Sequence, residues 1–576
     1  MRRLMNYLKN KKSYLALNNF LNNHNYFKLF NKYIKPFLLD IFICLLSIMI
    51  FTSANLIYPY IIELVIDDAL VNKSINKLFI YTFSMFFIVI IQSLSRYFVA
   101  NKSLTICQKI ILKIKEDITE QLSKYSQIFF GEYKRSQIIS VIENDLQQIE
   151  RVGIYIITEF LVSVITIIGL LIIIFVIDYH IAIVCIALLI LYAYLQKNNG
   201  KKLKSYSLGL SKSKGELYSH TQELVFNISD IKMLNYHHQY KKNYLNKCIE
   251  YFKKEKRITN LGVWSNIVGI VFNNLTLIIA LCLGGYMMLN EEMTVGILFS
   301  LTVYTQQLFS PVTVLTNLYV ELKKIQASLK RVSNILHNKK YVIQEGYKSS
   351  EQPLYGDIIL KDFSFSYGKE NIFNKANINI ENRSKIALIG SNGSGKTTLI
   401  RLLMRLQEDY QGEILLDGCN IEDYKLDYLR ENIICISQRP FILNGTILDN
   451  ILLNNKELTE EKVNEIISLV CLTDDIKNMP NGINTVIGDN GISLSGGQAQ
   501  KIALARIFVN DYSIIILDEP TSALDIESEE IICKNIYQYL NDKTIIAVTH
   551  RKTILKYCSP IYEVKNNLII EKTLCK

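Results

Sequence analysis

Long apolar runs alternate with basic, polar stretches over about the first 320 residues of the chain. A helix needs about 20 apolar residues to cross the hydrocarbon core of a bilayer, and six runs come close to that length. The predicted spans are residues 37–62, 78–99, 154–177, 179–195, 261–289 and 294–320. The fourth run is the shortest and the second contains Arg96, so the ends of these two are the least defined. We therefore predict an all-α transmembrane domain of six helices.

The long polar segments between spans carry a helical pattern of their own. Apolar residues recur there at three- and four-residue spacing, as they do at Ile138, Ile142, Leu146 and Ile149. We therefore expect the membrane helices to extend well beyond the bilayer. In residues 1–36, aromatic and aliphatic residues alternate with lysines just before the first span, which predicts an amphipathic elbow helix at the membrane surface.

The pattern changes after the last span. Residues 336–354 are polar and predict a linker, and residues 357–367 then alternate apolar and polar positions as strands do. The sequence thus divides into a segment 1–36, a six-helix transmembrane domain 37–335 with long cytoplasmic helical loops, the linker 336–354, and an α/β domain 355–576.

Composition and charge indicate how the chain is oriented in the membrane and exclude several classes of protein. Of 576 residues, 49% are hydrophobic and only 20% are charged, which excludes a disordered or coiled-coil chain. The net charge of +11 comes from Lys and Arg in the N-terminal segment and the two long loops, whereas the short turns near 178–180 and 291–292 have neither. Positive segments stay on the cytoplasmic side, so we expect a multi-pass protein of the cytoplasmic membrane with both termini and the α/β domain in the cytoplasm. The spans that flank these basic segments explain their charge, so nucleic-acid binding is not needed to account for it. The 11 cysteines include no C-x-x-C pair that would indicate a zinc site or redox chemistry.

The first candidate functional motif of the α/β domain is a glycine-rich loop. The segment KIALIGSNGSGKTTLIRLL places an apolar strand before the loop and an apolar-faced helix after it, which is the context of a P-loop. Glycines let backbone N–H groups turn onto phosphates at the start of a helix, Lys396 would reach the β- and γ-phosphates, and Thr397 would ligate Mg²⁺. The predicted ATP-binding residues of this loop are Gly390, Ser391, Asn392, Gly393, Ser394, Gly395, Lys396, Thr397 and Thr398.

Two acidic residues complete the predicted nucleotide site. The buried-strand run 513–517 ends in Asp518 and Glu519, and an acidic residue at such a strand end lies beside the P-loop in parallel sheets. Asp518 is suited to hold Mg²⁺ through water. Glu519 is suited to orient and polarise the attacking water, because phosphoryl transfer is catalysed mainly by positioning and charge stabilisation.

Between these elements stands LSGGQ, residues 494–498, and with it the α/β domain resembles the ABC ATPase family. Ser495, Gly496, Gly497 and Gln498 open a helix and form a second anion site, since N–H groups and the helix dipole point the same way. The first phosphate site already has its own helix, so the second anion site is free to bind the nucleotide of another molecule. The resemblance implies a head-to-tail dimer with two ATP molecules, each held between one P-loop and the opposite LSGGQ.

The resemblance also assigns roles to residues whose types alone leave them open. It implies that Tyr367 stacks on adenine, that Gln438 senses Mg²⁺ and the attacking water, and that His550 contacts the γ-phosphate. It places Ser522 to Asp525 across the dimer interface. This chain departs from the common family pattern at Ala499, Lys501 and Asp489.

The membrane half resembles the exporter branch of the same family, with the type IV fold. The order of the domains on one chain argues against importers, whose ATPases are usually separate chains. One chain supplies half of the assembly, so its partner is a second copy, or a related half-transporter. The matching positions are Asp67, Asn144, Asp145, Pro311, Ala327, Ser328 and Arg331.

The exported substrate is not fixed by the sequence, and a peptide, a lipid or a hydrophobic small molecule each stay open. Polar residues in spans either line a substrate cavity or join helices by hydrogen bonds. These residues are Gln92, Arg96, Glu159, Asn266, Asn273, Asn274, Gln306 and Gln307. A membrane-anchored immunity or regulatory ATPase that moves no substrate is the alternative function, whereas the spans oppose a soluble ABC ATPase.

Overall fold

The computed structural model describes residues 32–133, 135–349, 353–368, 370–453, 455, 458–488 and 491–572. Their contacts divide the chain into two compact units. Unit 1 contains the described residues up to 123 together with 135–338, and unit 2 contains 124–133 together with the described residues from 339 onward. Of the predicted N-terminal segment, residues 1–31 lie outside the described part of the chain.

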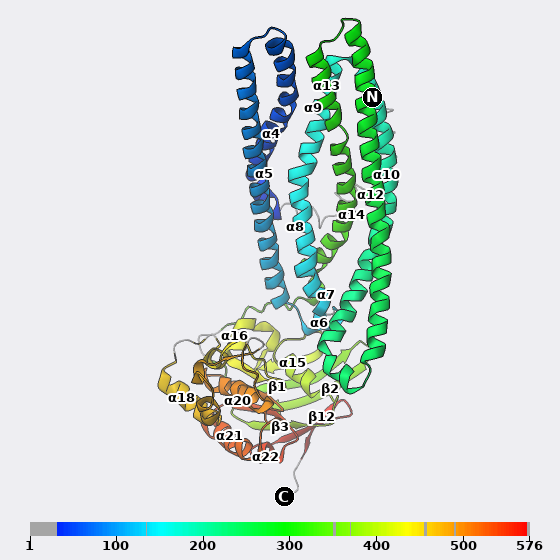
Figure 1. Ribbon diagram of the computed structural model, residues 1–576. Coiled ribbons are helices and arrows are strands. Elements are labelled where there is room, and N and C mark those ends of the chain that lie inside the picture. Colours follow the sequence, from blue (N-terminus) through cyan, green and yellow to red (C-terminus); the bar gives the residue numbers. More distant parts are fainter. Residues whose placement is uncertain are drawn as a thin grey trace. The chain divides into compact units, whose positions relative to one another are not determined.

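Unit 1 is built from long helices (Figure 1). Within the described residues, five helical stretches are long and apolar enough to cross a membrane, namely residues 35–70, 75–123, 137–177, 179–226 and 237–289. These helices extend far beyond the apolar runs of the sequence. Their principal helices are α4 (Leu38–Leu64), α5 (Ile75–Ser123), α7 (Arg135–Ser140), α8 (Leu146–Tyr155), α9 (Leu161–Ile177), α10 (Tyr179–Phe226) and α12 (His237–Leu289), and the short α11 (Ile228–Met233) precedes α12.

The sixth predicted span is formed by two helices instead of one. α13 (Val295–Gln307) ends before Leu308 and Phe309, and α14 (Ser310–Leu336) begins directly after them. Pro311 lies at the start of α14, and without an N–H it cannot continue the hydrogen-bond ladder from α13. The apolar run 294–320 therefore contains a break that its composition alone does not reveal.

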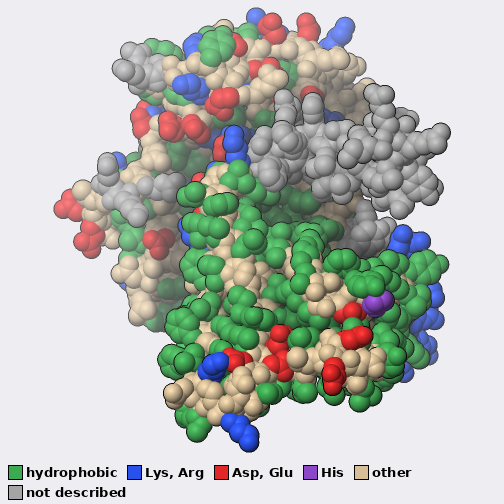
Figure 2. Space-filling model, turned by 90° about the horizontal axis from the view of Figure 1, so that it is seen from above, with side chains coloured by type: hydrophobic (Ala, Val, Ile, Leu, Met, Phe, Trp, Pro, Cys, Tyr) green, Lys and Arg blue, Asp and Glu red, His purple; other side chains and the backbone are tan. Residues whose placement is uncertain are grey.

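Unit 1 has a small buried core and a mostly apolar exterior. Leu170, Ile174 and Ala182 are fully buried among α9, α10, α13 and α14, whereas many large apolar side chains on α5, including Phe79 and Phe83, are exposed. Figure 2 looks from above onto the end of the helical part and shows mostly hydrophobic side chains there, with several Asp, Glu, Lys and Arg side chains among them. The exposed apolar side chains of α5 are those expected of a helix that faces lipid.

Unit 2 contains two main sheets. A parallel core in the order β11-β3-β10-β9-β6 carries the antiparallel edge strand β12, and an antiparallel sheet has the order β2-β1-β4-β5. The strands are β1 (Ile358–Tyr367), β2 (Glu370–Ile380), β3 (Lys385–Ile389), β4 (Gln411–Leu416), β5 (Cys419–Asn420), β6 (Ile433–Ile436), β9 (Ile514–Asp518), β10 (Thr544–Val548), β11 (Ile561–Lys565) and β12 (Leu568–Lys572), and β7 (Gly445–Thr446) pairs with β8 (Val486–Ile487).

Helices follow or cover these strands, as expected of an α/β domain. They are α15 (Lys396–Leu403), α16 (Leu426–Asn432), α17 (Ile447–Leu452), α18 (Glu460–Leu469), α19 (Thr473–Lys477), α20 (Gly496–Ala505), α21 (Ile526–Tyr539) and α22 (Lys552–Leu555). Strands β3, β9 and β10 are almost entirely buried, because β-branched and small apolar residues fill both faces of the sheet. The predicted class, a helical transmembrane region followed by an α/β domain, is confirmed.

Unit 2 also includes a short helix from the first half of the chain. α6 (Gln127–Glu132) is attached by backbone hydrogen bonds from Ser126 N to Tyr341 O at 2.8 Å and from Gln127 N to Leu406 O at 2.7 Å. Phe129 on α6 is fully buried, and its ring lies near those of Tyr125, Tyr133 and Tyr341. The chain therefore leaves unit 1, contributes one helix to unit 2, and returns.

Candidate active site

The glycine-rich loop joins β3 to α15 in a conformation that its glycines require. Gly390, Gly393 and Gly395 have φ of 151°, 82° and 107°, values that side chains rarely tolerate. A Cβ on Gly395 would lie 2.5 Å from Ile372 Cγ2, and one on Gly390 would lie 2.6 Å from Val564 O. The backbone can approach its neighbours here only without side chains.

Lys396 begins α15 and turns back over the loop. Its Nζ donates to Gly390 O at 2.5 Å and to Ser391 O at 2.9 Å, and the residue is 8% exposed. Burial lowers the pKa of Lys396, and the nearby carboxylates of Glu519 and Asp518 oppose that shift. The hydroxyl of Ser394 is buried without a partner among the described residues. A buried ammonium and an unpartnered hydroxyl beside the loop fit the phosphates of a nucleotide.

The two predicted acidic residues lie at the carboxyl end of β9, next to the loop. β9 pairs in parallel with β10, which pairs in parallel with β3, so the loop and the acids share one edge of the sheet. Thr397 Oγ1 lies 3.5 Å from Asp518 Oδ2. Burial raises the pKa of Asp518, and the neighbouring charge of Glu519 adds to the effect.

Glu519 is held away from the strand in an unusual backbone conformation. Its φ is +47°, and its N–H donates to Val548 O at the end of β10 at 2.9 Å. Gln438 Nε2 donates to Glu519 Oε2 at 2.6 Å. A non-glycine residue in this region stores strain, which occurs most often where a side chain must be aimed at a site.

The LSGGQ segment opens α20 with a capping box. Ser495 Oγ accepts from Gln498 N at 3.2 Å, and Gln498 Oε1 accepts from Ser495 N at 3.0 Å. The box leaves the N–H groups of Gly496 and Gly497 in the first turn for an anion. Within the described residues, no hydrogen bond joins this motif to the glycine-rich loop.

Comparison with known proteins decides the family. Residues 41–312 match the family model described as the ABC transporter transmembrane region, and residues 373–522 match the model described as ABC transporter. The chain belongs to the ABC transporter family. It is an exporter-type half-transporter, a multi-pass membrane protein in which the transmembrane region is fused to an ABC ATPase that is coupled to transport.

Relatives cover nearly the whole half-transporter. It is 26% identical over 552 residues to a Bacillus subtilis protein named "Putative multidrug export ATP-binding/permease protein YgaD", covering 94% of this chain and 95% of that protein. A Staphylococcus aureus protein of the same description is 28% identical over 556 residues, with 94% and 96% covered. The solved structure of a bacterial Atm1-family ABC exporter with ATP bound shares the fold, with a TM-score of 0.79, 19% identity, and 93% and 95% of the chains covered.

The remaining predicted residues of the half-transporter follow strands of two different sheets. Tyr367 ends β1, is 38% exposed, and donates from its hydroxyl to Gln407 Oε1 at 2.9 Å. His550 follows β10 and is exposed. Asp489 lies outside the described residues. The structure thus gathers the loop, both acids and Gln438, and leaves Tyr367 and the LSGGQ segment without a hydrogen bond to them among the described residues.

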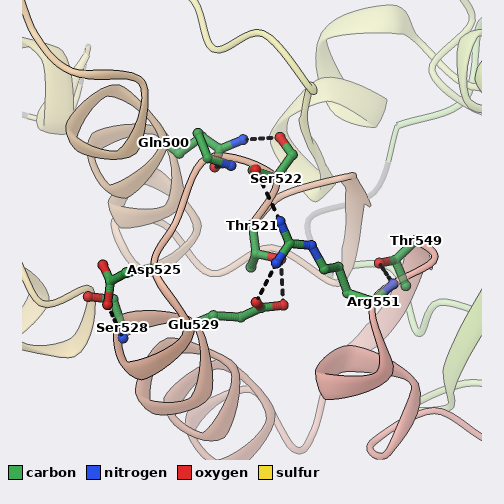
Figure 3. A network of polar contacts seen from close by, with 9 residues as sticks. Gln500, Thr521, Ser522, Asp525, Ser528, Glu529, Thr549 and Arg551 are labelled. Atoms are coloured by element: carbon green, nitrogen blue, oxygen red, sulfur yellow. Dashed lines mark hydrogen bonds and ion pairs between the residues drawn. The ribbon is translucent and has the colours of Figure 1, made fainter.

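A buried polar network fixes the chain after Glu519 (Figure 3). Glu529 on α21 is 2% exposed, accepts from Thr521 Oγ1 at 3.0 Å, and forms an ion pair with Arg551 at 3.0 Å. Arg551 also donates to Ser522 O at 3.1 Å. Gln500 on α20 donates to Ser522 Oγ at 2.8 Å. The loop after Glu519, the residue after His550 and the LSGGQ helix are therefore joined side chain to side chain.

A second carboxylate holds the LSGGQ helix from the other side. Asp475 on α19 accepts from Gln498 Nε2 at 3.0 Å and from Lys501 Nζ at 2.9 Å. Lys501 also donates to Cys471 O at 3.0 Å. Lys501, a departure from the common family pattern, is therefore used to anchor the helix inside unit 2.

Sequence reasoning missed these supporting residues for a physical reason. Arg551 directly follows His550, and that adjacency was the one available signal. Asp475 and Glu529 stand on helices with no motif around them, so only their contacts reveal them. In unit 1, Arg96 pairs with Glu159, and Gln307 Oε1 accepts from Asn55 Nδ2 at 3.2 Å. Of the two roles that the sequence left open for Arg96, Glu159 and Gln307, these contacts are the one that joins helices.

Proposed function

We propose that this half-transporter forms a homodimer that exports a substrate across the cytoplasmic membrane, driven by ATP binding and hydrolysis at two sites. The observation that supports it best is the convergence of Thr397 on Asp518 and of Gln438 on Glu519 at one edge of the sheet. Both termini and unit 2 lie in the cytoplasm in this proposal, since the basic segments flank the spans on that side.

The site residues divide the work of hydrolysis. The loop 390–398 binds the phosphates through backbone N–H groups and Lys396, and Tyr367 packs against the base. Glu519 orients and polarises the attacking water, Gln438 holds that carboxylate by its 2.6 Å hydrogen bond, and His550 contacts the γ-phosphate. Positioning and charge stabilisation suffice, because the phosphoryl transition state is loose.

The oxygen donors at the site fit Mg²⁺. Thr397, Gln438 and Asp518 supply a hydroxyl, an amide and a carboxylate, which are the ligand types that this cation prefers. When bound with ATP, the ion would neutralise negative charge on the phosphates.

The dimer follows from the separation of the two anion sites. Ser495, Gly496 and Gly497 open α20 with free N–H groups, and no hydrogen bond joins them to the glycine-rich loop of the same chain among the described residues. Each motif then completes the other subunit's site. ATP binds the closed dimer better than the open one, and only that differential affinity can shift unit 1 between inward- and outward-facing states.

The substrate belongs to one of three classes: a peptide, a lipid or a hydrophobic small molecule. Names of relatives that mention multidrug export favour the last of these. A membrane-anchored ATPase acting in immunity or regulation would use the same site without moving a substrate. Its rate of ATP hydrolysis would not change when any candidate substrate is added.

The test compares the wild type with Glu519→Gln in lipid vesicles. The variant should bind ATP as tightly as the wild type and lose at least about 100-fold in hydrolysis, since one positioned base contributes about 10²–10⁴-fold. Glu530→Gln, an exposed carboxylate on α21, is the matched control and should hydrolyse ATP normally. Hydrolysis retained by Glu519→Gln, or a wild type without ATPase activity, would contradict the proposal.

A further inference from the structure

A cavity of about 220 Å³ lies within unit 1 among α10, α12 and α14. It lies where the predicted spans 179–195 and 261–289 pass into the basic segment between them, and α14 closes it with Thr313, Thr316 and Asn317. This is the end of the spans that the charge pattern assigns to the cytoplasm. A molecule entering from the cytoplasm would reach this level of the protein first.

Three lining residues, Gln196, Ser265 and Thr313, belong to a polar network that also includes Tyr192 behind the lining. Gln196 is fully buried, its Nε2 donates to Tyr192 Oη at 2.9 Å and to Ser265 O at 3.0 Å, and its Oε1 accepts from Ser265 Oγ at 2.6 Å. Tyr192 Oη lies 2.7 Å from Thr313 Oγ1. The network joins all three helices and satisfies its own members, so it defines the shape of the cavity.

Three carboxamides on the cavity lining are different, because they are not used by the protein. Asn199, Asn266 and Asn317 each come from a different helix, and none makes a hydrogen bond to another described residue. Each carboxamide presents two N–H donors and an acceptor oxygen in one plane. Three such groups facing one space can serve a ligand that brings both donors and acceptors.

The described part of the lining also lacks the groups that bind ions or apolar cations. Among the side chains that the structure describes, no Asp, Glu, Lys, Arg or aromatic residue lines the cavity. Binding a cation at membrane depth without a carboxylate or an aromatic face would leave its charge uncompensated. An uncharged segment rich in amide groups meets no such penalty.

We propose that this cavity is a substrate subsite for an uncharged, amide-rich segment, and that the exported substrate is a peptide. The inference rests on the proposed export function and narrows its substrate to the peptide class, in place of the hydrophobic small molecules that the names of relatives favour. At about 220 Å³ the cavity is smaller than the 300–1,000 Å³ typical of whole ligand sites, so it accepts part of the substrate. The second protomer supplies an equal subsite.

Gly262 offers a direct way to fill the cavity. A Cβ placed on this lining residue would meet nothing within 4 Å, so a larger side chain enters open space without displacing its neighbours. Gly285 on the same helix also has nothing within 4 Å of a Cβ, and it does not line the cavity. Gly285→Leu is therefore the matched control for Gly262→Leu.

The chain supplies its own reporter of binding. Its single tryptophan, Trp264, lies on α12 between Gly262 and the lining residues Ser265 and Asn266. The experiment uses the full chain in vesicles without other protein, with acetyl-tetraalanine amide and, separately, tetraphenylphosphonium as probes. Trp264 emission reports binding, and ATP hydrolysis with and without each probe reports coupling.

The peptide should shift Trp264 emission in a saturable way at millimolar concentration or below and change hydrolysis by about five-fold or more, the low end of ordinary coupling between sites. Gly262→Leu should lose both responses and Gly285→Leu should keep both. A response to tetraphenylphosphonium alone, peptide responses that persist in Gly262→Leu, or no response to the peptide would each overturn the inference. Absence of basal hydrolysis in the wild type would instead contradict the proposed function.

Discussion

At the scale of single residues, the position of the acidic residues after β9 lowers the stability of the unliganded protein. Burial and the adjacent Glu519 charge raise the pKa of Asp518, so its ionised form is disfavoured there. A group of this kind is useful only when a cation or a phosphate-bound ion compensates it. Site geometry and local stability therefore oppose each other at this residue.

We predict that Asp518→Asn stabilises the unliganded chain and removes its stabilisation by ATP with Mg²⁺. The amide carries no charge to bury, and each kcal/mol recovered raises the midpoint of thermal unfolding by about 2–4 °C in a domain of this size. The measurement is thermal unfolding with and without ATP and Mg²⁺. Asp474→Asn, at a side chain 93% exposed, should change neither midpoint. A destabilised unliganded Asp518→Asn would contradict this account.

The Arg551–Glu529 pair gives a second prediction at this scale. Arg551→Met leaves the carboxylate of Glu529, on a residue only 2% exposed, without its ion-pair partner. Because the Arg551 side chain is 43% exposed, we expect the loss to stay below the about 3–5 kcal/mol of a fully buried pair. The double variant Arg551→Met with Glu529→Met removes both charges, so it should be more stable than Arg551→Met alone. Chemical denaturation of the three proteins measures the difference. Additive losses in the double variant would show that the pair is not coupled.

The same pair should act on hydrolysis through position. Arg551 holds Ser522, three residues after Glu519, and follows His550 directly. Arg551→Met should therefore lower kcat for ATP while KM changes much less, because the glycine-rich loop is untouched. A change confined to KM would contradict a positioning role.

At the scale of elements, the sequence predicted what local patterns determine. Apolar run length identified the membrane helices, alternation identified β1, and the loop and the acids appeared where parallel strands end. It did not predict the break at Leu308 and Phe309, since both residues are apolar and the effect comes from Pro311. Asn199 and Asn317 escaped notice as cavity residues because their importance arises only when three helices meet.

The attachment of α6 to unit 2 depends on one side chain in particular. We predict that Phe129→Ala loosens α6, because Phe129 is fully buried and removing such a ring costs about 3–5 kcal/mol. Hydrogen exchange of residues 127–132 should accelerate, and the effect of bound substrate on ATP hydrolysis should fall. Phe130→Ala, at the adjacent and less buried ring, is the control and should change exchange less. Equal protection in the two variants would refute a special role for Phe129.

At the scale of the whole molecule, the head-to-tail dimer makes a quantitative prediction about mixed assemblies. A chain with Lys396→Ala paired with a chain carrying Gly497→Glu retains one intact site, because both lesions fall in the same composite site. A wild-type chain paired with the double variant has one lesion in each site. The first pairing should hydrolyse ATP at about half the wild-type rate or less, and the second should be nearly inactive.

Tandem purification of differently tagged chains isolates each mixed dimer for this comparison. The doubly tagged wild-type dimer is the control for the effect of the tags. Equal activity of the two mixed dimers would exclude composite sites and with them the proposed arrangement.

The path of the chain through α6 also has a consequence for biogenesis. The ribosome delivers α6 long before residues 341 and 406, to which its backbone is hydrogen-bonded. During that interval the aromatic face around Phe129 has no cover from the later part of unit 2. Unit 2 can be completed only after the intervening helices of unit 1 have been made, so its last folding step follows the synthesis of unit 1. A chain truncated ahead of residue 339 keeps that face open and presents it to chaperones and proteases.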